Sequence, residues 1–191
     1  MTLSHPVKNQ MGKLNNRIKA FGITYLKPIH QRVYNPTRNT KPIFLVGCGR
    51  SGTSMLVFRL EKSWQIELFN ENHPAAFQNF RIRDLATIEE VIDRSYAGLA
   101  LFKPILSTPQ TPILLSYFPT SWAVFVFRHY CDVINSSIKR FGLMSRPDHV
   151  NAWVNDDFAE FGAYQPPEKT KELIRSLWEP TLSPETGAAL Y

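Results

Sequence analysis

Short apolar runs alternate with helical segments along the middle of the chain. The clearest run, Ile43 to Val46, has the length and composition of a strand buried on both faces, and glycines follow it. Further strands are predicted at 65–69, 99–102 and 122–127, and helices at 53–62, 88–96, 112–117 and 132–140. Strands that alternate with helices predict parallel β-α-β units with right-handed crossovers. The pattern therefore predicts an α/β fold with a central parallel sheet flanked by helices in three layers.

Capping signals refine two of these helices. Thr87 and Glu90 have the spacing of a capping box, which predicts that the helix begins at Ile88. Gly142 tolerates the positive φ that often ends a helix, so it predicts the C-terminus of the helix at 132–140.

The two ends of the chain differ from the middle. Residues 1–40 are polar and basic without periodicity, which predicts a loosely structured basic arm before a domain at 41–191. After Asp148 the pattern becomes helical, with segments near 150–161 and 168–178, and Ser183-Pro184-Glu185 is typical of a helix start. Because the chain stops at Tyr191, about two turns into that last predicted helix, we expect a C-terminally truncated sequence.

Composition narrows the class of protein. The chain has 191 residues, of which 43% are hydrophobic and 20% charged, as expected for one globular core. No apolar run reaches the roughly 18 residues of a membrane span and no secretory leader is visible, so we expect no transmembrane segment and a cytoplasmic location. The two cysteines, Cys48 and Cys131, match neither a disulfide scaffold nor a zinc-site spacing, so we expect no metal.

The charge is concentrated at the N-terminal end. Residues 1–60 contain ten Lys and Arg and no Asp or Glu, whereas the remainder carries all sixteen acidic side chains. Such a field favours an anionic partner, whether a nucleotide, a nucleic acid, an acidic lipid surface or a sulfated or phosphorylated substrate. A merely solvated basic extension remains an alternative. The segment lacks the interleaved aromatic and basic residues of RNA-binding motifs, so we do not expect nucleic acid.

Residues 47–54, with the sequence GCGRSGTS, form a glycine loop between the first strand and a helix. Glycines allow a sharp turn, and successive backbone N–H groups at a helix N-terminus bind phosphate oxygens. The spacing is that of a nucleoside triphosphate loop, but Thr53 stands where that loop has lysine, and the cation is Arg50 instead. A glycine turn without a ligand is the other interpretation.

A second anion-binding candidate is Arg128, at the end of the strand at 122–127. In a nucleoside triphosphatase this strand often ends in an aspartate that helps to hold magnesium, which an arginine would repel. A guanidinium suits a phosphate, and Ser136 on the following helix could present its hydroxyl to the same anion. Alternatively, Arg128 is a salt-bridging surface residue.

Together, residues 43–60 and 125–142 resemble the two nucleotide-binding signatures of the sulfotransferases that use 3′-phosphoadenosine 5′-phosphosulfate (PAPS). Residues 50–54, RSGTS, match that family's 5′-phosphosulfate loop, and Arg128 and Ser136, eight apart, match its 3′-phosphate-binding pair. The arginine form of the loop looks most like the bacterial, carbohydrate and tyrosyl-protein branches. The resemblance covers about residues 42–142 and implies a P-loop-like fold and PAPS as donor. The donor-binding residues that it implies are Gly49, Arg50, Ser51, Gly52, Thr53, Ser54, Arg128 and Ser136.

By this resemblance, an acceptor hydroxyl or amine attacks the sulfuryl group while Arg50 and the loop amides stabilise the charge. Glu71 resembles the loop glutamate that serves as base in carbohydrate-modifying and tyrosyl-protein members, and His73 is the second candidate base. Both could instead be solvated loop residues. Lys103, at a strand end, either reaches the same cleft or is exposed.

The chain also departs from the family. Residues 143–191 contain no match to the basic, glycine-containing loop that closes over the nucleotide in its members. The acceptor (carbohydrate, protein tyrosine or small molecule) and the oligomeric state stay open. The alternatives are a P-loop kinase or nucleoside triphosphatase and a non-catalytic anion-binding protein.

Overall fold

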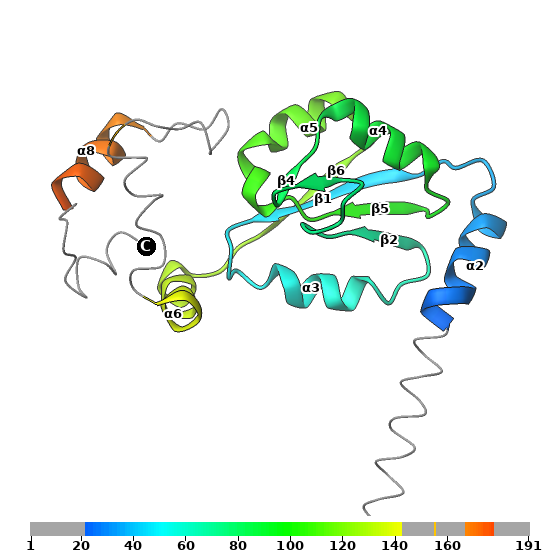
Figure 1. Cartoon of the computed structure of the whole chain (residues 1–191), viewed down its shortest axis with the longest axis horizontal. Helices are drawn as coiled ribbons and strands as arrows, with labels where there is room; N and C mark the ends of the chain where they lie inside the picture. The colour runs from blue at the N-terminus through cyan, green and yellow to red at the C-terminus, as the bar shows by residue number, and fades with distance from the viewer. Residues whose placement is uncertain (1–21, 143–154, 156–166, 178–191) are drawn as a thin grey trace, which may run out of the picture.

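The computed structural model describes residues 22–142, 155 and 167–177 (Figure 1). At its centre is a parallel sheet with the strand order β2-β5-β1-β6. Its strands are β1 (Lys41–Gly47), β2 (Ile66–Phe69), β5 (Leu99–Phe102) and β6 (Trp122–Val126). The predicted α/β class and parallel sheet are thus confirmed. The strands predicted at 65–69, 99–102 and 122–127 agree with β2, β5 and β6 to within one residue at each end, whereas β1 begins two residues before the predicted run at Ile43.

Helices cover both faces of the sheet. Figure 1 shows α3 (Thr53–Leu60) on one face and both α4 (Leu85–Arg94) and α5 (Thr111–Tyr117) on the other. A short antiparallel pair, β3 (Phe77–Gln78) and β4 (Arg81–Ile82), lies between β2 and α4 in the chain, and the 3-10 helix η2 (Ile105–Gln110) leads into α5. The architecture therefore has three layers, helix, sheet and helix.

Alternate residues of β1, β2 and β5 pack into two separate cores. Phe44 and Phe102 point to the face covered by α4 and α5, where they stack on each other at 5.6 Å between ring centroids. Leu45 and Leu101 point to the opposite face and pack with Val57 of α3. Because both faces are covered, β1 and β5 read as continuous apolar runs, which is why the sequence predicts them so closely.

Gly47, the last residue of β1, lies against β6. Its φ is +139°, and a Cβ built there would lie 2.6 Å from the carbonyl oxygen of Val126. Neither the conformation nor the contact accommodates a side chain. This glycine fixes the point at which β1 ends and the loop begins.

Replacing Gly47 by Ala is expected to lower the free energy of unfolding by about 2–4 kcal/mol, because it adds both backbone strain and overpacking. Gly49→Ala is the matched control, since a Cβ at Gly49 meets no atom within 4 Å. Urea denaturation of both variants measures the difference. Equal stability of the two would contradict the close approach of β1 and β6.

The start of α4 differs from the prediction. The helix begins at Leu85, and its cap is Asp84, whose carboxylate accepts hydrogen bonds from the Thr87 backbone N–H (2.9 Å) and hydroxyl (2.7 Å). Predicting the start at Ile88 with Thr87 as cap was therefore wrong, because Asp84 and Thr87 satisfy the same three-residue spacing one turn earlier. These hydrogen bonds, the one from the Thr87 hydroxyl first, hold the pKa of Asp84 below its ordinary value.

Because the pKa of Asp84 is lowered on folding, its stabilising contribution is present above the unfolded-state value of about 3.9 and is lost as the pH falls through the folded-state value. The melting temperature of Asp84→Asn, which keeps an acceptor oxygen, should therefore lie below that of the wild type at about pH 6. The difference between the two melting temperatures should shrink as the pH is lowered to about 3. Asp93→Asn, on the same helix, controls for the loss of one charge. A gap that stays constant with pH would contradict the role of the Asp84 carboxylate.

Residues 22–34 are helical, which corrects the expectation of a loosely structured arm over that part of 1–40. A π-helical turn, η1 (Gly22–Leu26), leads into α2 (Lys27–Tyr34). Two buried polar side chains attach α2 to the domain: Lys27 Nζ donates to the Glu61 carbonyl at 2.8 Å, and Gln31 Nε2 donates to the Trp64 carbonyl at 3.1 Å. Burial lowers the pKa of Lys27, although the charges of Glu61 and Glu67 oppose this effect. The sequence does not reveal this helix because its polar residues face inward.

After β6 the chain forms α6 (Tyr130–Phe141), which begins two residues before its predicted start and is followed by the predicted C-terminal glycine, Gly142, with a φ of +81°. Within the predicted helical C-terminal part, the structure describes α8 (Glu168–Leu177), as predicted. The helix predicted from Ser183 lies outside the described residues, and so does the helix predicted at 150–161 apart from Asn155, which is in a turn. No helix in the described part combines the length and apolarity that a bilayer span requires.

Candidate functional site

The glycine loop follows β1 at the carboxyl edge of the sheet, the edge where ligands of α/β proteins bind. It has two left-handed residues, Arg50 (φ +67°) and Gly52 (φ +106°), and Gly52 is the residue before α3. The positive φ at Arg50, a residue with a long side chain, is the kind of strain that concentrates at functional sites. The loop is thus a tight turn whose last residue opens the N-terminus of α3.

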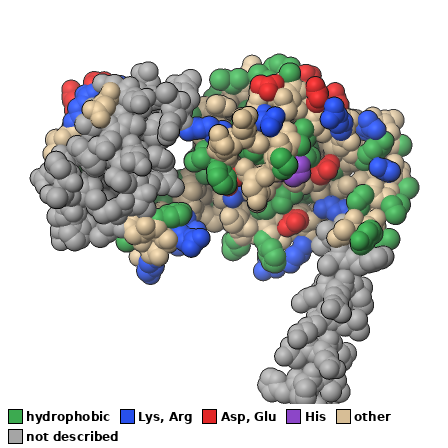
Figure 2. Space-filling view, viewed as in Figure 1, with side chains coloured by type: hydrophobic (Ala, Val, Ile, Leu, Met, Phe, Trp, Pro, Cys, Tyr) green, Lys and Arg blue, Asp and Glu red, His purple; other side chains and the backbone are tan. Residues whose placement is uncertain are grey.

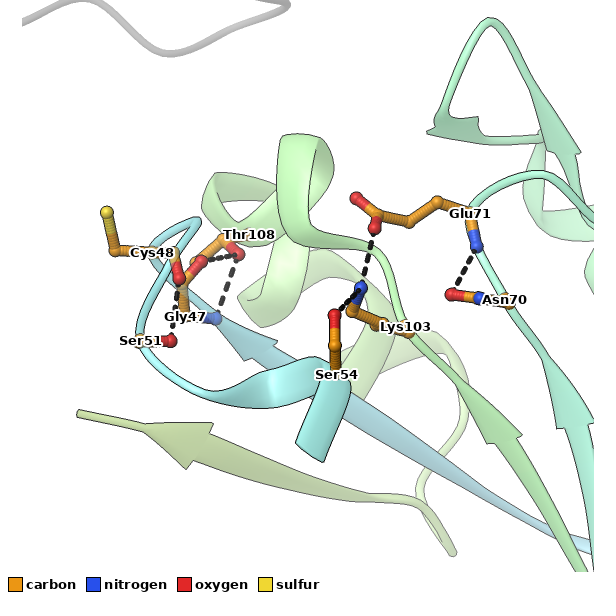
Figure 3. A network of polar contacts seen from close by, with 8 residues as sticks. All are labelled: Gly47, Cys48, Ser51, Ser54, Asn70, Glu71, Lys103 and Thr108. Atoms are coloured by element: carbon orange, nitrogen blue, oxygen red, sulfur yellow. Dashed lines mark hydrogen bonds and ion pairs between the residues drawn. The ribbon is translucent and has the colours of Figure 1, made fainter. Parts of the chain in front are cut away.

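Hydrogen bonds within the loop and from the 3-10 helix η2 hold this turn. Ser51 donates its hydroxyl to the Cys48 carbonyl at 2.6 Å, and its backbone N–H also points to that oxygen. From η2, the hydroxyl of Thr108 accepts from the Gly47 N–H at 3.1 Å and donates to the Gly47 carbonyl at 3.0 Å (Figure 3). Thr108 comes from η2, about 60 residues further along, so no local motif points to it. The hydroxyl of Ser51 is thus hydrogen-bonded within the loop, where it stabilises the turn.

Arg50, Arg128 and Ser136 meet over the ends of β1 and β6. The Nε atom of Arg50 donates to Ser136 Oγ at 3.1 Å, and Nη1 of Arg128 donates to the Arg50 carbonyl at 3.4 Å. The three residues come from the loop, the end of β6 and the middle of α6. Both guanidinium groups are exposed, and Arg128 makes a loose ion pair with Asp132, with 3.6 Å between Nε and Oδ2. The sequence predicted a role for each of these residues, and the fold brings them together.

A second polar group lies over the ends of β2 and β5. Nζ of Lys103 bonds to Glu71 Oε2 at 2.8 Å and to Ser54 Oγ at 3.3 Å (Figure 3). The Lys103 side chain is 9% exposed and that of Glu71 is 21% exposed. A partly buried ion pair of this kind places a carboxylate, a cation and a hydroxyl beside the first turn of α3. Of the two interpretations of Lys103, the structure therefore contradicts the exposed strand end.

Strand pairing explains why Lys103 and Glu71 meet. β2 and β5 are parallel neighbours in which Phe69 pairs with Phe102, so the residues that follow them emerge side by side. The Lys103 N–H also donates to the Phe69 carbonyl at 3.1 Å, which extends the ladder by one residue. In this setting Lys103 supplies, from another strand, a cation next to a loop that has Thr53 in the usual lysine position.

His73 does not join this network. Its ring packs edge-on against Phe69, with 5.0 Å between centroids, and its Nδ1 atom is buried without a hydrogen-bond partner in the described part of the chain. Its backbone N–H donates to the Asn70 carbonyl, which shapes the turn after β2. Of the two candidate bases, Glu71 is the one that contacts other polar site residues.

The remaining loop positions differ in exposure. Thr53 is 4% exposed, whereas Ser54 is exposed and reaches Lys103. Gly49 is exposed at the outer side of the turn. Cys48 and Cys131 are both free thiols, and the described residues include no group of three or more His, Cys, Asp or Glu side chains that could hold a metal ion.

Comparisons with protein-family models, with curated proteins and with solved structures were made for the whole chain. None of the three finds a match.

Proposed function

We propose that the chain is a PAPS-dependent sulfotransferase. The observation that carries this proposal is the meeting, at one point of the sheet edge, of Arg50 with Arg128 and Ser136, which lie 78 and 86 positions after it in the chain. Two cations and a hydroxyl beside a glycine loop suit a nucleotide with two separate anionic groups. Adenosine 3′,5′-bisphosphate and its sulfuryl derivative are nucleotides of this kind.

The residues present fit such a donor. The N-terminus of α3 and the loop amides would hold the 5′-phosphosulfate, with Arg50 beside them, because unpaired N–H groups and a helix dipole favour an anion. Arg128 and Ser136 would hold the 3′-phosphate, to which a guanidinium can donate two parallel hydrogen bonds. Neither set of contacts needs a metal ion or the usual loop lysine.

The donor supplies an activated sulfuryl group: an acceptor oxygen or nitrogen forms a bond to sulfur as the bond from sulfur to the 5′-phosphate oxygen breaks. The proton of the acceptor goes to the Glu71 carboxylate, the base that the site offers. Lys103 orients that carboxylate through the 2.8 Å contact and keeps positive charge beside Ser54, close to the loop. Arg50 and Lys103 together offset the negative charge that develops on the oxygens of the moving and leaving groups.

The alternatives remain a P-loop kinase or nucleoside triphosphatase and a non-catalytic anion-binding protein. The first requires magnesium, for which a carboxylate at the end of β6 would be expected where the chain has Arg128. The second requires no base, so the partly buried Glu71 would be left without a chemical role.

Isothermal titration calorimetry separates the three functions. The proposal expects adenosine 3′,5′-bisphosphate to bind in the presence of a chelator and more tightly than adenosine 5′-phosphate. Binding of ATP that depends on magnesium would favour the kinase or triphosphatase, and equal affinity for the bisphosphate and for inorganic phosphate would favour a general anion binder. Either of these results would overturn the proposal.

A further inference from the structure

In α2 the polar and apolar sides are reversed relative to an ordinary surface helix: polar residues face the domain and apolar residues face solvent. A surface helix normally packs its apolar side on the core and exposes its polar side. In α2, the polar residues Lys27 and Gln31 are each only 8% exposed and bond to main-chain carbonyls of the domain. The side that faces solvent therefore carries the apolar residues.

This outward side is an apolar stripe, formed by Leu26, Ile29 and Val33. Their exposed fractions are 45%, 59% and 69%, and their spacing of three and four residues places them along one face of the helix. Tyr34, at the end of the helix, is 76% exposed. Figure 2 shows hydrophobic surface and basic groups on the side of the molecule where α2 lies. Aligned exposed apolar residues mark a contact surface, whereas scattered ones do not.

The sequence up to the end of α2 carries charge of one sign, although Glu61 and Glu67 of the domain lie close enough to act on Lys27. The first acidic residue of the chain is Glu61, and six Lys and Arg precede or lie within α2 up to Tyr34. One of them, Arg32, lies on α2 itself, with its guanidinium 5.3 Å from the ring centroid of Tyr96. Lys27 is engaged with the domain, so the basic charge comes mainly from Arg32 and from Lys8, Lys13, Arg17 and Lys19 of the preceding sequence.

We propose that α2 is an interfacial helix that binds the domain to an anionic lipid bilayer. An apolar stripe next to a basic segment without acidic residues is the combination that lies in a membrane interface, with side chains in the acyl boundary and cations at the headgroups. A nucleic acid backbone would attract the charge but would leave Leu26, Ile29 and Val33 in water. A second copy of the chain would bring like charges together.

The position of α2 makes this contact compatible with a working site. α2 and its flanking residues attach where strands begin: Asn35 Nδ2 donates to the Ala97 carbonyl at 2.9 Å, just before β5, and Gln31 reaches Trp64, just before β2. The glycine loop, Glu71 and Lys103 lie where strands end. A bilayer bound at α2 would thus leave the nucleotide site facing away from the lipid, so this proposal is independent of the reaction proposed above.

Flotation of the full chain with vesicles tests the inference. The wild type is expected to float with phosphatidylcholine vesicles that contain about 30% phosphatidylserine, more weakly with pure phosphatidylcholine, and less as salt rises. Ile29→Ser/Val33→Ser should reduce binding to the anionic vesicles roughly tenfold or more, as should Lys13→Ala/Arg17→Ala/Lys19→Ala. Ile113→Ser/Leu115→Ser, which removes two exposed apolar residues from α5, is the matched control and should bind like the wild type.

Several results would overturn the inference. They are the absence of wild-type binding, equal binding to neutral and anionic vesicles, and unchanged binding by the Ile29→Ser/Val33→Ser variant. Sedimentation velocity without lipid distinguishes a second copy as the occupant: a dimer that dissociates in the stripe variant, without vesicle binding by the wild type, would assign the stripe to self-association. Thermal melts of every variant verify that each is folded before binding is compared.

Discussion

Glu71→Gln is expected to lower kcat by about 10²–10⁴-fold, the usual loss when a general base is removed. Glutamine keeps an oxygen that can accept from Lys103 but takes up no acceptor proton. Turnover can be followed as release of adenosine 3′,5′-bisphosphate from PAPS, using whichever of an acidic tyrosine peptide, an oligosaccharide or a phenol the wild type accepts.

A purely structural role for Glu71 would give a different result. It would lower stability and nucleotide affinity together with kcat, whereas loss of a base leaves the dissociation constant of adenosine 3′,5′-bisphosphate unchanged. Glu90→Gln, an exposed carboxylate on α4, is the control for the charge change. If Glu71→Gln turns over like Glu90→Gln, Glu71 is not the base.

Arg128→Ala is expected to weaken adenosine 3′,5′-bisphosphate binding by about tenfold to a hundredfold, the range for losing a charge-assisted hydrogen bond. The loss should be selective, because adenosine 5′-phosphate has no 3′-phosphate to contact this guanidinium. Calorimetry of the two nucleotides with wild type and variant measures the selectivity directly.

Arg140→Ala is the matched control, since Arg140 is an exposed arginine in the last turn of α6. Ser136→Ala should weaken the same nucleotide to a smaller extent, as expected for a neutral hydroxyl. Equal losses for both nucleotides in Arg128→Ala would show that this arginine acts through the general field of the site, which contradicts a 3′-phosphate contact.

The sequence predicts the central strands well because burial on both faces leaves a strong signal. β1 and β5 are continuous apolar runs, and the glycines that follow β1 predict a turn there. β6 is an informative exception. Its run of apolar residues also predicts a covered strand, yet Trp122 and Phe125 are 52% and 64% exposed. Hydrophobicity thus identifies the strand without revealing whether the described part of the chain covers it.

Helix α2 could not be predicted because its pattern is reversed. Sequence rules assume that apolar residues face the core, so a helix held by the polar groups of Lys27 and Gln31 reads as an irregular basic segment. The inward contacts are to the main-chain carbonyls of Glu61 and Trp64, which no side-chain pattern encodes.

The candidate site could be predicted from the sequence only where its residues lie next to a local motif. Arg50, Arg128 and Ser136 stand next to recognisable local features, a glycine loop and a strand end. The pairing of Lys103 with Glu71 depends on β2 and β5 being neighbours, which is a property of strand order and not of local sequence. Thr108, which bonds to Gly47, has no recognisable local motif in the sequence, and its contact with the loop is revealed only by the fold.

The open side of β6 affects how every experiment above should be run. In the described part of the chain β6 pairs only with β1, so its other side offers backbone donors and acceptors flanked by aromatic rings. An unpaired strand edge of this kind can pair with another copy of the chain as the protein concentration rises. Affinities and melting temperatures should therefore be compared at two protein concentrations, so that aggregation is not mistaken for ligand binding or for stability.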